Sequence, residues 1–120
     1  MKINDMKIND MKISEMANQF GFKIAAGNGL DRKISKIYIC DLLSFAMSKA
    51  PKDSVWITVI NNINVIAVAS LADVSCVIMA EGVTPDEQAV EKAESIGIPL
   101  LLSDLPAFEI GQSIAARIDG

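Results

Sequence analysis

Downstream of Ser35, the chain alternates short apolar runs with stretches in which apolar residues recur at helical spacing. The apolar runs cover residues 37–40, 55–60, 76–80 and 99–102. Strands that alternate with helices are typical of βαβ crossovers and therefore of a parallel sheet. The run at 55–60 carries β-branched residues on both faces, as expected when helices cover both sides of a sheet. The pattern predicts an α/β fold with a mostly parallel sheet and helices on both faces.

Each apolar run precedes a predicted helix. These helices cover residues 42–49, 65–72, 85–96 and 106–118. The third has the clearest start, because Thr84-Pro85-Asp86-Glu87 reads as a capping box. In this motif Thr84 caps the helix, Pro85 takes the first helical position and Glu87 reaches back.

The N-terminal part predicts a smaller element ahead of these units. Residues 13–20 have the apolar spacing of a short helix, and 22–26 read as a strand. The Gly-Asn-Gly at 27–29 follows, and Asn-Gly is a strong hairpin signal because both positions tolerate positive φ. We therefore expect a second strand, beginning near Arg32, to pair back on the first as a small antiparallel pair.

The extreme N-terminus is a tandem repeat. Residues 1–10 are two copies of Met-Lys-Ile-Asn-Asp, and 11–15 are the near-copy Met-Lys-Ile-Ser-Glu. A period of five fits no repeat architecture, because solenoid units run to about 20–50 residues. We expect 1–10 to be a duplicated, disordered segment and 11–120 to form a single domain.

Composition limits the classes of partner that the protein is expected to bind. Hydrophobic residues make up 51% of the 120 residues and aromatic residues only 5%, so the core must be aliphatic. The net charge is −4, and the 11 basic residues are scattered along the chain. Binding to nucleic acids or to anionic membranes relies on clustered Lys and Arg, so neither partner is expected.

Nothing in the pattern indicates export or a membrane span. The longest nearly continuous apolar stretch, 65–72, is far shorter than the ~20 residues that a bilayer requires. Cys40 and Cys76 both lie in apolar runs, which predicts two buried free thiols in a cytoplasmic protein. Two cysteines without histidine do not indicate a metal site, and no cofactor is expected.

Most enzyme classes lack their usual residues here. The chain has no histidine, no Walker A loop and no G-x-G-x-x-G motif. An acid–base pair drawn from Asp41, Glu81 and Asp104 stays open. The simpler interpretation is that Asp41 caps one helix, Ser103 or Asp104 caps the last, and Glu81 is a solvated turn residue. We therefore expect no catalytic activity.

A ligand site is better supported than an active site. Parallel sheets place their binding residues after the carboxyl ends of the strands, where helix N-termini favour anions. The candidate binding residues are Asp41, Asn61, Asn62, Glu81, Gly82, Ser103 and Asp104. Because these loops contain no Lys or Arg, their carboxylates would oppose a bare phosphate unless a cation such as Mg²⁺ bridged it.

Two further features have alternative interpretations. The segments 65–72 and 42–47 are more apolar than a fold of this size needs, which indicates a homodimer interface or simple burial on the sheet. The adjacent Asp31 and Arg32 indicate a solvated bend with a weak local ion pair, or an Arg offered to a partner or nucleotide.

An ordered set of short motifs resembles the DRTGG domain family from about Met11 onward. The matching segments are 29–35, which holds the Asp31-Arg32 pair of the family motif, then 38–44, 53–58, 66–71, Pro85-Asp86 and 98–104. Two places differ from the family pattern. The Thr-Gly-Gly usual after the Asp-Arg pair is Ser35-Lys36-Ile37 here, and the Gly-Gly usual before the Pro-Asp helix start is Glu81-Gly82.

The resemblance implies a stand-alone α/β domain similar to the N-terminal domain of HPr kinase/phosphorylase. It also implies a regulatory, dimer-forming module without catalytic activity, of a kind found alone or fused to enzymes and nucleotide-sensing CBS domains. A kinase function is not implied, since the chain has no P-loop. We therefore expect a regulatory or scaffolding module acting through homodimerisation and a partner enzyme. The alternative is a sensor that binds an adenine nucleotide at the carboxyl edge of the sheet.

Overall fold

The computed structural model describes residues 11–118, and the predictions for residues 1–10 lie outside this part. The helices are α1 (Ile13–Phe20), α2 (Leu43–Lys49), α3 (Ile63–Ala72), α4 (Glu87–Ile96) and α5 (Ala107–Ile118). The strands are β1 (Lys23–Ala26), β2 (Lys36–Ile39), β3 (Ser54–Thr58), β4 (Cys76–Met79) and β5 (Leu100–Leu102). All four predicted βα units are therefore present, with ends that differ by a few residues.

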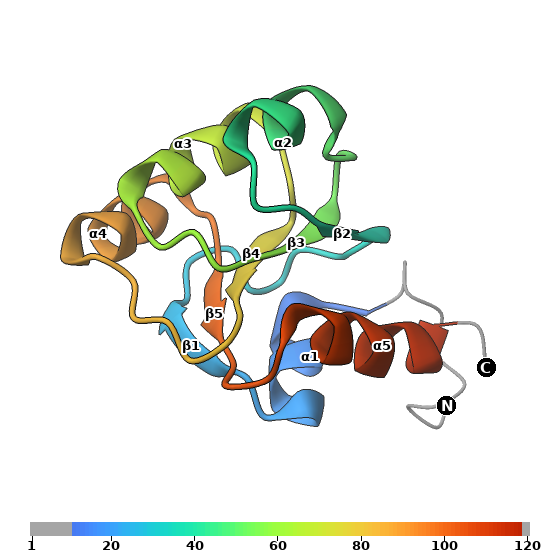
Figure 1. The fold of residues 1–120 in the computed structure, drawn as a ribbon. Helices are drawn as coiled ribbons and strands as arrows, with labels where there is room; N and C mark the ends of the chain where they lie inside the picture. Colours follow the sequence, from blue (N-terminus) through green and yellow to red (C-terminus); the bar gives the residue numbers. More distant parts are fainter. Residues whose placement is uncertain (1–10, 119–120) are drawn as a thin grey trace.

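The five strands form one sheet in the order β1-β5-β4-β3-β2 (Figure 1). Strands β2 to β5 are parallel, with Ile37 opposite Val55 and Val77 opposite Leu100. Strand β1 runs antiparallel to β5 at one edge. The predicted α/β class with a mostly parallel sheet is confirmed.

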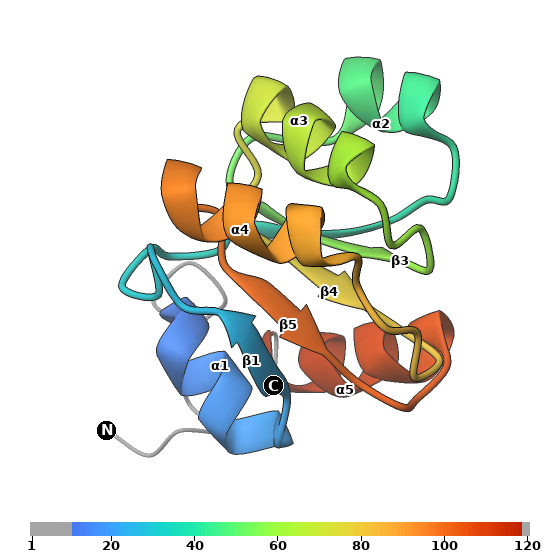
Figure 2. The same ribbon diagram turned by 90° about the vertical axis from the view of Figure 1, so that its left-hand side faces the viewer.

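Helices cover both faces of the sheet. Helices α2, α3 and α4 lie on one face, and α1 and α5 lie on the other (Figures 1 and 2). Side chains alternate between these layers along β3, where Trp56 belongs to the core under α2–α4 and Val55 and Ile57 belong to the core under α1 and α5. Every residue of β3 is buried, which explains why its sequence is apolar on both faces.

The antiparallel pair exists, but the predicted hairpin partner is wrong. Strand β1 pairs with β5, far away in sequence, and not with a strand near Arg32. The loop at 27–29 instead packs against the end of α4, where the Gly27 amide donates to Glu94 Oε2 at 2.9 Å. Gly29 has φ +93°, and a Cβ there would lie 2.6 Å from the Gly97 carbonyl oxygen. The loop is thus shaped by a tertiary contact and not by a tight hairpin.

The predicted capping box at Thr84 is also wrong. Helix α4 begins at Glu87, after Asp86 in an extended conformation. The preceding loop is held by Asn61, whose side-chain amide donates to the Thr84 carbonyl at 2.7 Å and whose own carbonyl accepts from the Asp86 amide at 3.0 Å. These bonds use the polar groups of the loop, so the helix starts about one half-turn later than the motif indicates.

Candidate functional site

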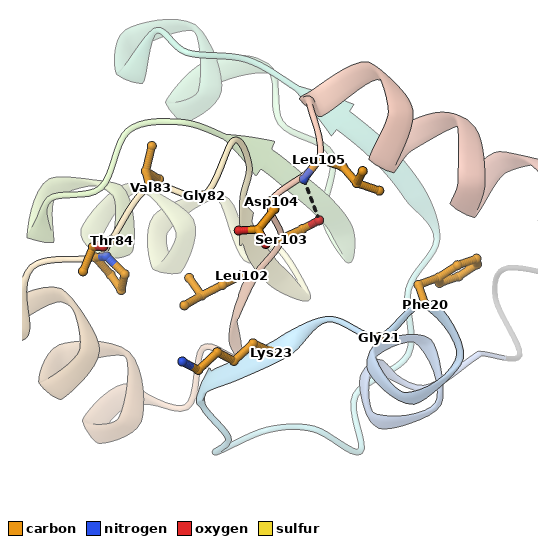
Figure 3. Close-up of a pocket in the computed structure, with 11 residues that line it drawn as sticks. Phe20, Gly21, Lys23, Gly82, Val83, Thr84, Leu102, Ser103, Asp104 and Leu105 are labelled. Atoms are coloured by element: carbon orange, nitrogen blue, oxygen red, sulfur yellow. Dashed lines mark hydrogen bonds between the residues drawn. The ribbon is translucent and has the colours of Figure 1, made fainter.

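A pocket of about 550 Å³ opens where β4 and β5 end (Figure 3). Its walls come from the β4–α4 and β5–α5 loops and from the end of α1 with the start of β1. The lining residues are Phe20, Gly21, Lys23, Gly82, Val83, Thr84, Pro85, Leu102, Ser103, Asp104 and Leu105. Pockets that hold small molecules measure roughly 300–1,000 Å³, so this one has a suitable size.

Lys23 brings a positive charge to this edge of the sheet. Because β1 is antiparallel, its first residue lies beside Leu102, the last residue of β5. Its side chain is exposed and makes no ion pair with any residue from 11 to 118. Sequence reasoning missed Lys23 because it assigned β1 to a separate hairpin. No local signal places it at this edge, because the Gly-Asn-Gly at 27–29 predicts a hairpin.

The turn after β4 is built on two left-handed residues, Glu81 (φ 62°) and Gly82 (φ 71°). Their amides donate to the carbonyls of Leu105 at 2.9 Å and Ser103 at 3.0 Å, which ties the two pocket loops together. A Cβ on Gly82 would lie 3.1 Å from Asp104 Oδ1. Glycine at position 82 therefore supplies both the backbone angle and the space for the Asp104 carboxylate.

Neither Ser103 nor Asp104 caps α5, contrary to expectation. The helix begins at Ala107, and the Pro106 carbonyl accepts its first-turn hydrogen bond from Ile110. Ser103 Oγ accepts instead from the Leu105 amide at 3.2 Å. The Asp104 carboxylate accepts no hydrogen bond from the described residues and lines the pocket.

Asp41 also differs from its predicted role as a helix cap. Its Oδ1 accepts from Thr58 Oγ1 at 2.8 Å and from the Val59 amide at 2.9 Å, so it joins the ends of β2 and β3. Leu42 occupies the N-cap position of α2. Asp41 follows β2, the strand at the far edge of the sheet from β1, and does not line the pocket.

The two asparagines after β3 have structural partners. Asn61 holds the loop before α4, as described above, and Asn62 caps α3 by accepting from the Asn64 amide at 2.9 Å. The pocket thus brings together Gly82, Ser103 and Asp104 from the predicted set. Asp41, Asn61, Asn62 and Glu81 do not line it.

The Arg32 of the family motif lies in a different place, near the amino ends of the strands. Its Nη2 donates to Asp53 Oδ1 at 2.9 Å, Asp73 Oδ1 at 2.7 Å and the Asp73 carbonyl at 2.8 Å. Asp53 and Asp73 both have positive φ. Desolvation lowers the pKa of the Arg32 guanidinium, but the hydrogen bonds and charges of these two aspartates outweigh it and raise the pKa. Arg32 holds loops together, and its partners are not the adjacent Asp31.

Within residues 11–118, no cluster of three or more His, Cys, Asp or Glu could hold a metal ion. Both cysteines are free; Cys76 is buried as expected, whereas Cys40 is only partly buried. Burial raises the pKa of the Cys76 thiol, against a smaller opposing effect of the Arg32 charge. No helix in the described part of the chain has the length and hydrophobicity to cross a bilayer.

The fold and pocket define an α/β domain with a ligand-sized opening at the carboxyl edge of its sheet. The chain matches the DRTGG domain over residues 6–116 and belongs to that family. Comparison with curated proteins gives no match.

One similar solved structure contains the CBS and DRTGG domains of the regulatory region of Clostridium perfringens pyrophosphatase, complexed with the activator diadenosine tetraphosphate. It shares 13% sequence identity with this chain at a TM-score of 0.74. The match covers 98% of this chain and 52% of that one, so our chain spans about half the length of its neighbour. The likeness confirms the fold.

Proposed function

We propose that this protein is a non-catalytic regulatory module that acts by forming a homodimer and contacting a partner enzyme. One observation carries the proposal, namely the outer surface of α2 and α3. Helix α3 contains no charged residue, and α2 contains only Lys49. Leu42, Phe45 and Met47 at α2 and Leu71 on α3 are each more than half exposed.

The two helices pack side by side (Figure 1), and we infer that their exposed apolar side chains contribute to one surface. Scattered exposed apolar residues are ordinary, but an extended apolar patch normally marks an interface. Helix α4 on the same face has Glu87, Glu91, Lys92 and Glu94 and is a normally solvated helix.

Sedimentation velocity tests the homodimer. The unmodified chain is expected to sediment as a dimer, and Phe45→Glu or Leu71→Glu as a monomer with an unchanged circular dichroism spectrum. Phe108→Glu is the matched control, because Phe108 is 70% exposed but lies on α5 in the opposite layer. A monomeric unmodified chain, or a dimer that only Phe108→Glu dissociates, contradicts this interface.

A second function, sensing of an adenine nucleotide, is favoured by a separate observation. The carboxyl-edge pocket has a ligand-sized volume, and Lys23, Thr84 and Asp104 all line it. The DRTGG-containing pyrophosphatase region was crystallised with diadenosine tetraphosphate, which supports a ligand that contains adenine here.

Thermal unfolding with a panel of nucleotides tests the sensor. A ligand at 100 times its Kd adds about 2.7 kcal/mol to the free energy of unfolding, which raises the Tm by several degrees. An increase that is lost in Lys23→Ala supports the sensor at this pocket. A panel without any increase removes this second function and leaves the dimeric module.

A further inference from the structure

We infer that the carboxyl-edge pocket takes a ligand with a single anionic group and adjacent hydroxyl or amino donors, on the scale of a nucleoside monophosphate, and rejects polyphosphates. This inference rests on the sensor function proposed above. It names the ligand class of that site.

The first argument is the number of positive charges. Lys23 is the single cationic side chain that lines the pocket, and Asp104 also lines it while Glu81 lies in the adjoining turn. A single phosphate can be paired with Lys23. Each further phosphate adds negative charge that faces carboxylates, and like charges held close together repel one another.

The second argument is that three backbone amides of the two pocket loops already have partners. Phosphate-binding loops present free amides to a chain of phosphates. Here the amides of Glu81, Gly82 and Leu105 donate to Leu105 O, Ser103 O and Ser103 Oγ, respectively. The turn resembles a phosphate loop in its two left-handed residues, but its amides hold the two loops together and are not directed at a ligand.

The third argument comes from Asp104. Its carboxylate accepts hydrogen bonds only, finds no donor among the described residues and is positioned against Gly82. Because Asp104 is exposed and accepts no hydrogen bond from the described residues, a ligand that carries hydroxyl or amino groups can donate to its carboxylate. Val83, Leu102 and Leu105 add apolar side chains to the lining, which suits a ring. An anion, a donor-rich middle and an apolar ring are together the chemistry of a nucleoside monophosphate.

Isothermal titration calorimetry of the full chain with AMP, adenosine, inorganic phosphate and ATP, at fixed ionic strength without Mg²⁺, tests the inference. AMP is expected to bind at least about tenfold more tightly than ATP. Lys23→Ala is expected to weaken the binding of AMP by about tenfold, which is the effect of one charge-assisted hydrogen bond. The affinity for adenosine should stay nearly unchanged. Lys92→Ala, which removes the same charge from the outer face of α4, should change neither.

Asp104→Asn gives an opposite signature. It keeps the shape of the side chain but removes the charge, so adenosine and AMP should bind more weakly and ATP more tightly. Thermal unfolding of each variant verifies that the fold is intact, and Lys23→Met is a second test of the same cation.

The possible failures are distinguishable. If ATP binds more tightly than AMP and depends on Lys23, the inference about ligand class is overturned while the sensor function stands. If inorganic phosphate alone binds as tightly as AMP, the donor and ring arguments are overturned. If none of the four probes binds, both the ligand class and the sensor function are overturned.

Discussion

The two ends of the sheet use charged side chains differently. Near the amino ends, Arg32 pairs with Asp53 and Asp73, and the three loops that carry them are joined through one nitrogen atom. At the carboxyl ends, Lys23 and Asp104 line a pocket and pair with no described residue. Charges that are satisfied within the protein contribute to folding. Charges that are left unpaired beside an opening are available to a ligand.

The largest expected effect is at the amino end. Arg32→Ala removes three hydrogen bonds to a carbonyl and two carboxylates, and should lower the free energy of unfolding by about 2–3 kcal/mol. Urea unfolding followed by circular dichroism measures it. Lys52→Ala is the control, because Lys52 Nζ lies 3.8 Å from Asp73 Oδ2 and its side chain is 72% exposed. Its removal should cost less than about 0.5 kcal/mol, and equal losses in both variants would contradict the central role of Arg32.

A second effect depends on pH. Burial raises the pKa of the Cys76 thiol, so the folded chain keeps this proton at alkaline pH while the unfolded chain loses it above about pH 8.5. The contribution of Cys76 to stability is therefore fully present below that pH. Above it, the free energy of unfolding falls by up to about 1.4 kcal/mol per pH unit. Cys76→Ala should be less stable at neutral pH but show a flatter alkaline slope.

Urea titrations from neutral pH upward measure the slope. Ser54→Ala is the comparison variant, because Ser54 is equally buried, does not titrate in this range and has no hydrogen-bond partner among the described residues. It should keep the full slope. If the free energy of unfolding falls equally steeply with pH in the unmodified chain and in Cys76→Ala, this thiol ionises equally in the folded and unfolded states.

A smaller effect separates the left-handed residues at the two ends. Asp73 (φ 58°) is held by Arg32, whereas the side chain of Glu81 (φ 62°) has no described partner. Glu81→Gly should raise the free energy of unfolding by about 0.5 kcal/mol, because glycine adopts this conformation without strain. Asp73→Gly should lower it by about 1 kcal/mol through the lost ion pair and hydrogen bond. Thermal unfolding measures the stability of both variants. If both are more stable than the unmodified chain, the contact between Arg32 and Asp73 does not stabilise the fold.

The smallest effect on stability is expected at Lys23. Lys23→Ala removes an exposed, unpaired charge and should change the free energy of unfolding by less than about 0.5 kcal/mol. The same urea titration measures it. A loss as large as that of Arg32→Ala would mean that Lys23 is structural and would remove the contrast between the two ends.

The parallel part of the fold was predictable because its signals are local and repeated. Each strand is a short apolar run, and each helix follows at once, so the α/β class needs no knowledge of distant contacts. The strand that became β1 was also predicted. Its partner was not, because the Gly-Asn-Gly at 27–29 gives the same signal whether it forms a hairpin or packs on the end of α4.

The site was predictable only in part, for the same reason. Gly82, Ser103 and Asp104 follow parallel strands, so the topology alone places them at one edge. Lys23 reaches that edge through a pairing of residues far apart in sequence, which no local pattern encodes. The helix-cap assignments of Asp41 and Thr84 failed because tertiary hydrogen bonds, donated by Thr58 to Asp41 and by Asn61 to Thr84, compete with local capping.

The pairing of β1 with β5 has a consequence for how the molecule is made. Lys23 is among the first described residues to leave the ribosome, and its neighbour Leu102 is among the last. During translation, β2, β3 and β4 can associate in order as each emerges, but β1 must wait for β5 before it finds a place in the sheet. Closing so long a loop is entropically costly and slow compared with local contacts. The pocket is therefore assembled only after β5 has been made, and a nascent chain that stops before β5 has no such pocket to offer a ligand.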